Sequence, residues 1–240
     1  MINIEEMDLI AGNDIPCRDI CRVRQPVLKD IKNIGYNTYQ DYLSILLIDK
    51  DSLIKSLGIE VSDEVNDIPL YAIIGAIPGL RESYINSLSF FTAPEDRISW
   101  RRNRFEINGI FASTEILEDI AAIVAKISNI EKDTSSQHVF ASEKARKIWE
   151  KCQKGKQELS KTKKEDVNLA IPNVISSVSA SNSGYTLLNI WELTVYQLYD
   201  QFSRINRKIQ MDIYSSRWAA WGQDEFDTSI WFKNSLIKEG

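Results

Sequence analysis

Two cysteines, Cys17 and Cys21, have the spacing that most directly suggests chemistry. They are four positions apart, so on a helix both thiols would lie on one face. A structural zinc site needs four ligands, and the single histidine, His138, is far away in a polar stretch. We therefore interpret Cys17 and Cys21 as ordinary reduced cysteines and His138 as a solvated loop residue. We predict no metal site.

The sequence lacks the motifs that position phosphates or nucleophiles. Gly75 and Gly79 lie in an apolar stretch without a following Lys-Ser or Lys-Thr pair, so there is no P-loop. No G-x-S-x-G nucleophile elbow occurs. The acidic residues between Glu60 and Asp67 lack the glycine and spacing of a calcium loop. We predict that the protein is not an enzyme, has no catalytic residues and uses no cofactor.

An arginine cluster interleaved with aromatic residues is the best candidate for a nucleic-acid contact, since cations meet phosphates and aromatic rings stack on bases. It comprises Arg97, Arg101, Arg102 and Arg104, with Trp100 and Phe105. Alternatively, the arginines form the outward face of a strand pair and the two aromatic rings turn inward. The net charge of −5 favours this second interpretation. We predict no nucleic-acid partner.

The longest helical pattern runs from Trp191 to Trp218. Its apolar residues recur at steps of three and four, which is the spacing of one helix face; they are Trp191, Val195, Leu198, Phe202, Ile205 and Ile209. Thr194 and Gln197 have the spacing of a capping box, and Asn189 with Glu192 offers an alternative start. Gly222 is the predicted stop.

Further apolar and aromatic residues lie off this stripe, so the helix needs more than one neighbour. Some of that surface is predicted to contact another protein, with arginine at the rim of an apolar groove. The predicted partner-binding residues are Tyr196, Tyr199, Arg204, Tyr214, Trp218 and Trp221. Alternatively, the aromatic side chains form the core of a C-terminal helical hairpin, whose second helix is predicted between residues 224 and 238.

The rest of the chain predicts helices with one small β element. Helical spacing follows Pro26 and Thr38, and a third, short helix ends before Gly58. Residues 87–112 change period, and SLSFF, RISWRR and RFEIN predict two or three short antiparallel strands. Ser113 or Thr114 then caps a helix with an isoleucine-rich stripe. The predicted fold class is mainly α, or α+β with a small antiparallel β element around residues 88–108 and a C-terminal helical hairpin.

Composition divides the chain into three parts. Residues 1–150 are predicted to form a mostly helical body that includes the β element. Residues 151–184 form a lysine- and serine-rich linker, within which SSVSASNSG is either linker or the end of a helix. Residues 185–240 form the helical hairpin. The longest uncharged stretch, Ile68 to Leu80, is too short to cross a bilayer, and no N-terminal signal is visible. We predict a cytoplasmic protein.

Several segments together resemble the tail assembly chaperones of phages and prophages of Gram-positive bacteria. The resemblance lies in NIWELTVYQLYDQFSRINRKIQMDIYSSRWAAWG with the following WFKNSL, and in QPVLKDIKNIGYNTYQDYLSILLID, LSFFTAPED and SEKARKIWEKCQKGK. It rests on apolar patterning and aromatic residues rather than on a catalytic signature.

This resemblance implies a non-enzymatic assembly factor in the cytoplasm of the infected or lysogenic bacterial host. Such chaperones hold the long tape measure protein until tail tube subunits polymerise around it. The implied partners are the tape measure protein, the tail tube protein and further copies of the chain, with no membrane. The alternative is a structural component of the tail or neck of the virion.

Overall fold

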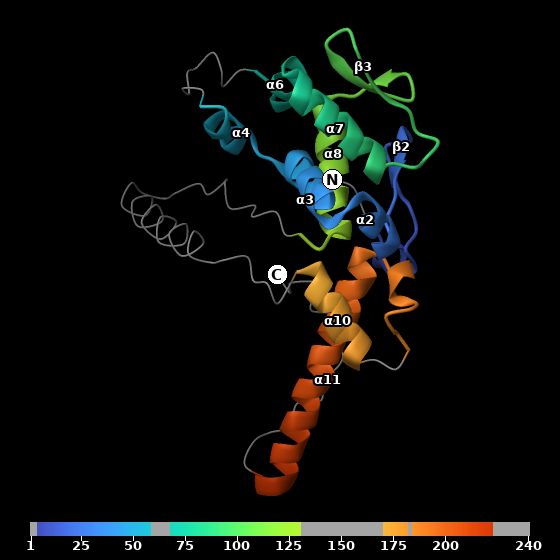
Figure 1. Cartoon of the computed structure of the whole chain (residues 1–240), viewed down its shortest axis with the longest axis vertical. Coiled ribbons are helices and arrows are strands. Elements are labelled where there is room, and N and C mark those ends of the chain that lie inside the picture. The colour runs from blue at the N-terminus through green and yellow to red at the C-terminus, as the bar shows by residue number, and fades with distance from the viewer. Residues whose placement is uncertain (1–3, 59–67, 131–169, 182–183, 223–240) are drawn as a thin grey trace. The chain divides into compact units, whose positions relative to one another are not determined.

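The computed structural model describes residues 4–58, 68–130, 170–181 and 184–222. The chain divides into two compact units. The described residues of the first unit are 4–58, 68–130 and 189–200, and those of the second are 170–181, 184–188 and 201–222. The helices and short antiparallel strands of Figure 1 confirm the predicted mainly α fold with a small β element.

Helices make up most of the first unit. In chain order they are α1 (Glu6–Ala11), α2 (Leu28–Ile34), α3 (Tyr36–Leu47), α4 (Lys50–Ser56), α6 (Leu70–Ala76), α7 (Pro78–Phe91) and α8 (Thr114–Ile127). The helices predicted after Pro26 and Thr38 correspond to α2 and α3, and the predicted third helix is α4. Asp49 caps α4 by accepting a 2.8 Å hydrogen bond from the Ser52 backbone N–H.

The core of the first unit forms around α3, which packs against both α7 and α8. The predicted stripe of α8 is confirmed, since its isoleucines and Val124 are buried and the Ser113 side chain accepts a hydrogen bond from the Ile116 N–H. Tyr39 of α3 packs its ring against Phe91 of α7 at 6.0 Å. Its hydroxyl donates a 3.2 Å hydrogen bond to Ser128 Oγ, so one side chain connects all three helices.

The predicted β element is present but begins later than expected. Strands β3 (Ile98–Arg101), β4 (Arg104–Ile107) and β5 (Ile110–Phe111) form an antiparallel sheet in that order. The prediction of a strand at SLSFF is wrong, because residues 87–91 belong to α7. Pro78 begins this helix, and Tyr84, Leu88 and Phe91 are buried at helical spacing.

A second hairpin joins β1 (Ile15–Cys17) and β2 (Cys21–Val23). Cys17 and Cys21 therefore lie on opposed strands rather than on a helix, which corrects the helical interpretation of their spacing. Arg18 and Asp19 both have left-handed φ angles, of 48° and 57°. Consecutive residues in this conformation make the tight turn that matches the twist of a hairpin.

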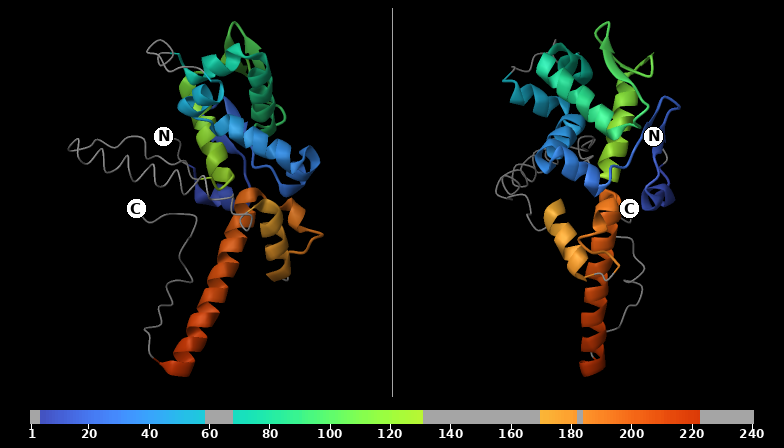
Figure 2. Two further views of the ribbon diagram at one scale, coloured as in Figure 1. Left: turned by 60° about the vertical axis from the view of Figure 1, so that its left-hand side comes forward. Right: turned by 45° about the vertical axis from the view of Figure 1, so that its right-hand side comes forward.

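The C-terminal region contains α10 (Ile171–Ser181), the 3-10 helix η2 (Ile190–Glu192) and α11 (Val195–Trp221). Both views of Figure 2 show α11 as one uninterrupted helix. Gly222 ends it as predicted, with a φ of 58° and an N–H that donates to Trp218 O at 2.8 Å. The second helix of the predicted hairpin falls on residues outside the described ranges.

The start of α11 confirms the predicted capping box. The Gln197 N–H donates to Thr194 Oγ1 at 3.2 Å, and the Thr194 N–H donates to Gln197 Oε1 at 2.9 Å. The alternative start at Asn189 is wrong, because residues 190–192 form the separate helix η2. Trp191 therefore precedes α11 and does not belong to its apolar stripe.

Helix α10 falls within the range predicted as linker. It carries buried apolar residues at helical spacing, namely Ile171, Val174, Ile175 and Val178. Of the two alternatives for SSVSASNSG, the end of a helix is correct for its first residues, which belong to α10. Residues 151–169 lie outside the described ranges. The division into the three regions 1–150, 151–184 and 185–240 remains a prediction.

The capping box provides a first test. We expect Thr194→Ala to lower the free energy of unfolding by about 1 kcal/mol, because the Gln197 N–H loses its acceptor. Urea denaturation followed by circular dichroism measures the change. Thr194→Ser is the matched control, since it keeps the hydroxyl and should retain most of the stability. Equal losses in the two variants would contradict a contribution from the cap.

Candidate partner-binding surface

The first turn of α11 is anchored within the first unit. The Leu28 N–H donates to Leu193 O at 2.8 Å, and Gln197 Nε2 donates to Ile10 O at 2.8 Å. Val195, Tyr196 and Leu198 are buried. One backbone hydrogen bond, one hydrogen bond from a side-chain amide and apolar packing therefore fix the beginning of this helix.

Beyond its first turn, α11 becomes progressively exposed. Phe202 and Ile205 keep intermediate exposure. Five large side chains follow that are about half or more exposed: Ile209 (49%), Ile213 (54%), Tyr214 (47%), Trp218 (52%) and Trp221 (68%). We call these five residues the distal apolar face. Exposed apolar clusters of this kind mark interaction sites in soluble proteins.

A depression of about 590 Å³ follows part of the distal apolar face. Its described lining residues follow one another at alternating steps of three and one along the helix: Ile209, Asp212, Ile213, Ser216, Arg217, Ala220 and Trp221. One carboxylate and one guanidinium thus accompany three large apolar side chains. This mixture suits an amphipathic helix from a partner, which would bring its own apolar residues at the same spacing.

The predicted partner-binding residues divide by position. Tyr196 is only 2% exposed and is a core residue of the first unit, which corrects its assignment to the binding surface. Tyr199 is half-buried, and burial, with a smaller contribution from Tyr36, raises its pKa to about 12. Arg204 is exposed. Partner binding by Tyr199, Arg204 and the three distal aromatic residues remains a prediction.

Sequence reasoning missed Ile209 and Ile213 as surface residues. Ile209 was assigned to the inward stripe, yet it is exposed like its neighbour one turn later. Helical spacing reveals which residues share a face, but not where along the helix the covering elements end. The clue was the length of α11, which exceeds what one small body ordinarily covers.

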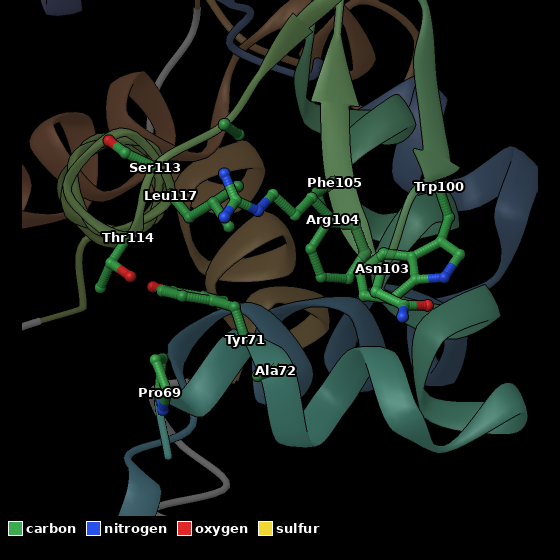
Figure 3. A pocket seen from close by; sticks show the side chains of 11 residues that line it. Pro69, Tyr71, Ala72, Trp100, Asn103, Arg104, Phe105, Ser113, Thr114 and Leu117 are labelled. Carbon is green, nitrogen blue, oxygen red and sulfur yellow. The ribbon is translucent and has the colours of Figure 1, made fainter. Parts of the chain in front are cut away.

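A second hollow, of about 450 Å³, lies in the first unit between α6, the β3–β4 hairpin and the start of α8. Figure 3 shows Arg104 extending across it toward Leu117, while the hydroxyls of Tyr71 and Thr114 point toward one another. Its described lining residues include one cation and three hydroxyls, and no carboxylate is among these described residues. Such a lining suits an anionic or hydrogen-bonding group.

The arginine cluster adopts the second of its two predicted arrangements. Phe105 is buried, and Trp100 packs edge-on against it with ring centroids 4.7 Å apart. The Arg81 guanidinium covers the Trp100 ring at 5.6 Å, whereas Arg101, Arg102 and Arg104 are exposed. The aromatic rings are therefore engaged in packing rather than presented for stacking on bases. The absence of a nucleic-acid partner remains a prediction.

Other candidates for chemistry show no assembled site. Among the described residues, no three side chains of His, Cys, Asp or Glu gather as metal ligands would. His138 and the acidic run from Glu60 to Asp67 lie outside the described ranges. Within those ranges, no helix has the length and apolar content needed to cross a bilayer.

Comparison with known families points to phages. The model of a family described as the YomV second domain matches residues 161–235, which include α10 and α11. This family is phage-associated, from a Bacillus prophage, so the similarity supports a phage origin. No curated protein and no solved structure matches the chain.

Proposed function

We propose that the protein is a phage tail assembly chaperone that binds and solubilises the tape measure protein during tail morphogenesis. The observation that carries this proposal is the distal apolar face, with its tyrosine and two tryptophans exposed on one long helix. The similarity of this region to a phage-associated family supports the same setting. The protein acts by binding, without catalysis and without a cofactor.

The physical requirement of such a partner matches the distal apolar face. A tape measure protein is long, helical and amphipathic, so it exposes apolar stripes that aggregate in water. A helix that offers Trp218 and Trp221 beside Asp212 and Arg217 can cover one such stripe and fix its orientation through charge. The start of α11 is held by hydrogen bonds and apolar packing within the first unit, whereas the distal apolar face is exposed.

The proposal also specifies where the protein acts and in which order the steps of tail assembly occur. The protein works in the cytoplasm of the infected or lysogenic host and holds the tape measure protein until tail tube protein polymerises around it. A second copy of the chain is a further expected partner, since two distal apolar faces can cover one another until they are used. The chaperone leaves before the particle is complete.

Replacing both Trp218 and Trp221 by alanine tests the proposal. When the chain is produced together with the phage's tape measure protein, we expect the double variant to recover at least about tenfold less of the complex, because exposed tryptophans are typical binding hot spots. Its melting temperature should change little, since both side chains are already largely exposed. Affinity purification followed by quantification of both chains gives the measurement.

Phe111→Ala is the matched control, because it removes an exposed aromatic ring from a different element, β5. It should leave recovery of the complex unchanged. The proposal fails if the double variant retains wild-type recovery. Mass spectrometry of finished particles addresses the alternative of a structural tail or neck component, since that component would be present in stoichiometric amounts.

A further inference from the structure

The β1–β2 hairpin holds two thiols directly opposite one another. Cys17 pairs with Cys21 in the antiparallel register, and Ile15 pairs with Val23 on the same buried face. Both cysteines are buried and free. The interaction between the two side chains lowers the pKa of Cys17, and the same interaction together with burial raises that of Cys21. The strand register itself places the two thiols side by side on the buried face of the hairpin.

The backbone spacing of such a pair suits a covalent bond. Directly opposed residues of antiparallel strands have Cα atoms about 4.5–5.5 Å apart. Disulfides span Cα separations of about 4.4–6.8 Å. The register therefore places the backbones of Cys17 and Cys21 within the range that a disulfide spans.

The surrounding contacts keep the hairpin in this register. Arg18 in the turn forms ion pairs with Glu115, at 3.1 Å, and with Asp119, both on α8. On the other side, Asn108 Nδ2 donates to Ile20 O at 2.8 Å. The turn between the cysteines is thus attached to two other elements. The folded chain holds the thiols opposed, and so at a higher local concentration than the three-residue connection alone provides in the unfolded chain.

We propose that Cys17 and Cys21 form a redox modification site, a dithiol that small-molecule disulfides oxidise to an intramolecular disulfide. The thiolate of one cysteine attacks the disulfide RS–SR, forming a mixed disulfide and releasing RS⁻. The thiolate of the second cysteine then attacks the protein sulfur of that mixed disulfide and releases the second RS⁻. The protons of the two cysteines pass to the released thiolates, so RS–SR is reduced to two RSH.

The disulfide would add a covalent link to the non-covalent contacts that hold the β1–β2 hairpin together. In the reduced protein, the strands are held by hydrogen bonds and by the contacts of Arg18 with α8. A disulfide makes the pairing of β1 with β2 permanent in an oxidising environment. The site is independent of the distal apolar face, so its test does not depend on the proposed chaperone function.

The experiment compares disulfide formation in the folded and unfolded chain. The full chain carries Cys152→Ser, which leaves Cys17 and Cys21 as its only thiols. Samples are equilibrated in mixtures of oxidised and reduced glutathione under two conditions. One set is refolded from urea into native buffer that contains the mixture, and the other set stays in concentrated urea with the same mixture. Refolding in the redox mixture lets the buried thiols react before they are covered. Acid quenching, maleimide labelling and intact mass then give the fraction oxidised.

We expect both thiols to be lost together, with a mass decrease of about 2 Da and no lasting glutathione adduct. Half-oxidation in native buffer should need a ratio of oxidised to reduced glutathione at least about tenfold lower than in urea, because the fold holds the thiols together. Cys17→Ser and Cys21→Ser, in the same background, should keep one thiol or a glutathione adduct. The proposal is overturned if the native chain needs an equal or higher ratio, or if it accumulates the mixed disulfide.

Discussion

Gly75→Ala is expected to lower the free energy of unfolding by about 1–3 kcal/mol, although alanine ordinarily strengthens a helix interior. Gly75 lies in α6, and a Cβ atom there would meet the Trp100 indole, 2.5 Å from Cζ3 and 2.7 Å from Cζ2, with Cη2 closer still. The ring cannot easily move aside, because Phe105 and the Arg81 guanidinium pack against it. Overlap with a fixed ring therefore outweighs the gain in helix propensity.

Gly79→Ala is the matched control for this prediction. Gly79 lies in the first turn of α7, and a Cβ atom there would meet nothing within 4 Å. This variant should be neutral or more stable by up to about 1 kcal/mol. Urea denaturation of both variants measures the difference, and near-ultraviolet circular dichroism reports on the Trp100 environment. A neutral Gly75→Ala would show that α6 and the β3–β4 hairpin can separate without loss.

Leu198→Ala should have the largest effect on stability, a loss of about 2–5 kcal/mol. Leu198 is fully buried in the first turn of α11, where truncation leaves a cavity beside the residues that anchor the helix. The capping box and the hydrogen bond from the Leu28 N–H to Leu193 O lie at this same end of α11. Equilibrium urea unfolding, monitored by tryptophan fluorescence, measures the loss.

Ile209→Ala on the same helix is the comparison. The two residues were predicted to share one inward stripe, but Ile209 belongs to the exposed distal apolar face. Its truncation should cost less than about 1 kcal/mol, because little buried contact is removed. Similar losses at Leu198 and Ile209 would contradict the graded burial of α11.

Local chemistry explains which parts of the fold could be predicted. The Thr194–Gln197 capping box and the Ser113 cap depend on hydrogen bonds between residues three apart, so their signals are complete within a few positions. The segment SLSFF was wrongly predicted to be a strand, because a short aromatic run is compatible with both the strand period and the helix period. The helical period is visible only over the longer segment α7, in which Tyr84 is buried one turn before Leu88 and two turns before Phe91.

Long-range packing explains what could not be predicted at the candidate site. Tyr196 lies off the main stripe and was expected to meet a partner, yet the first unit covers it. The opposite error occurred at Ile209, which lies on the stripe but beyond the covering elements. Both errors arise because periodicity shows only which residues share a face of the helix, whereas burial also depends on where a residue lies along the helix axis. The pairing of Cys17 with Cys21 likewise depended on a turn of Arg18 and Asp19 that carries no glycine signal.

The graded burial of α11 divides one helix into two stretches that evolve under different demands. Substitutions around Leu198 must preserve shape, since they are judged by whether the chain folds. On the proposed function, substitutions from Ile209 onward are limited by the partner that this stretch binds rather than by the buried core. The proposal thus assigns stability to the buried stretch of α11 and partner specificity to the exposed one.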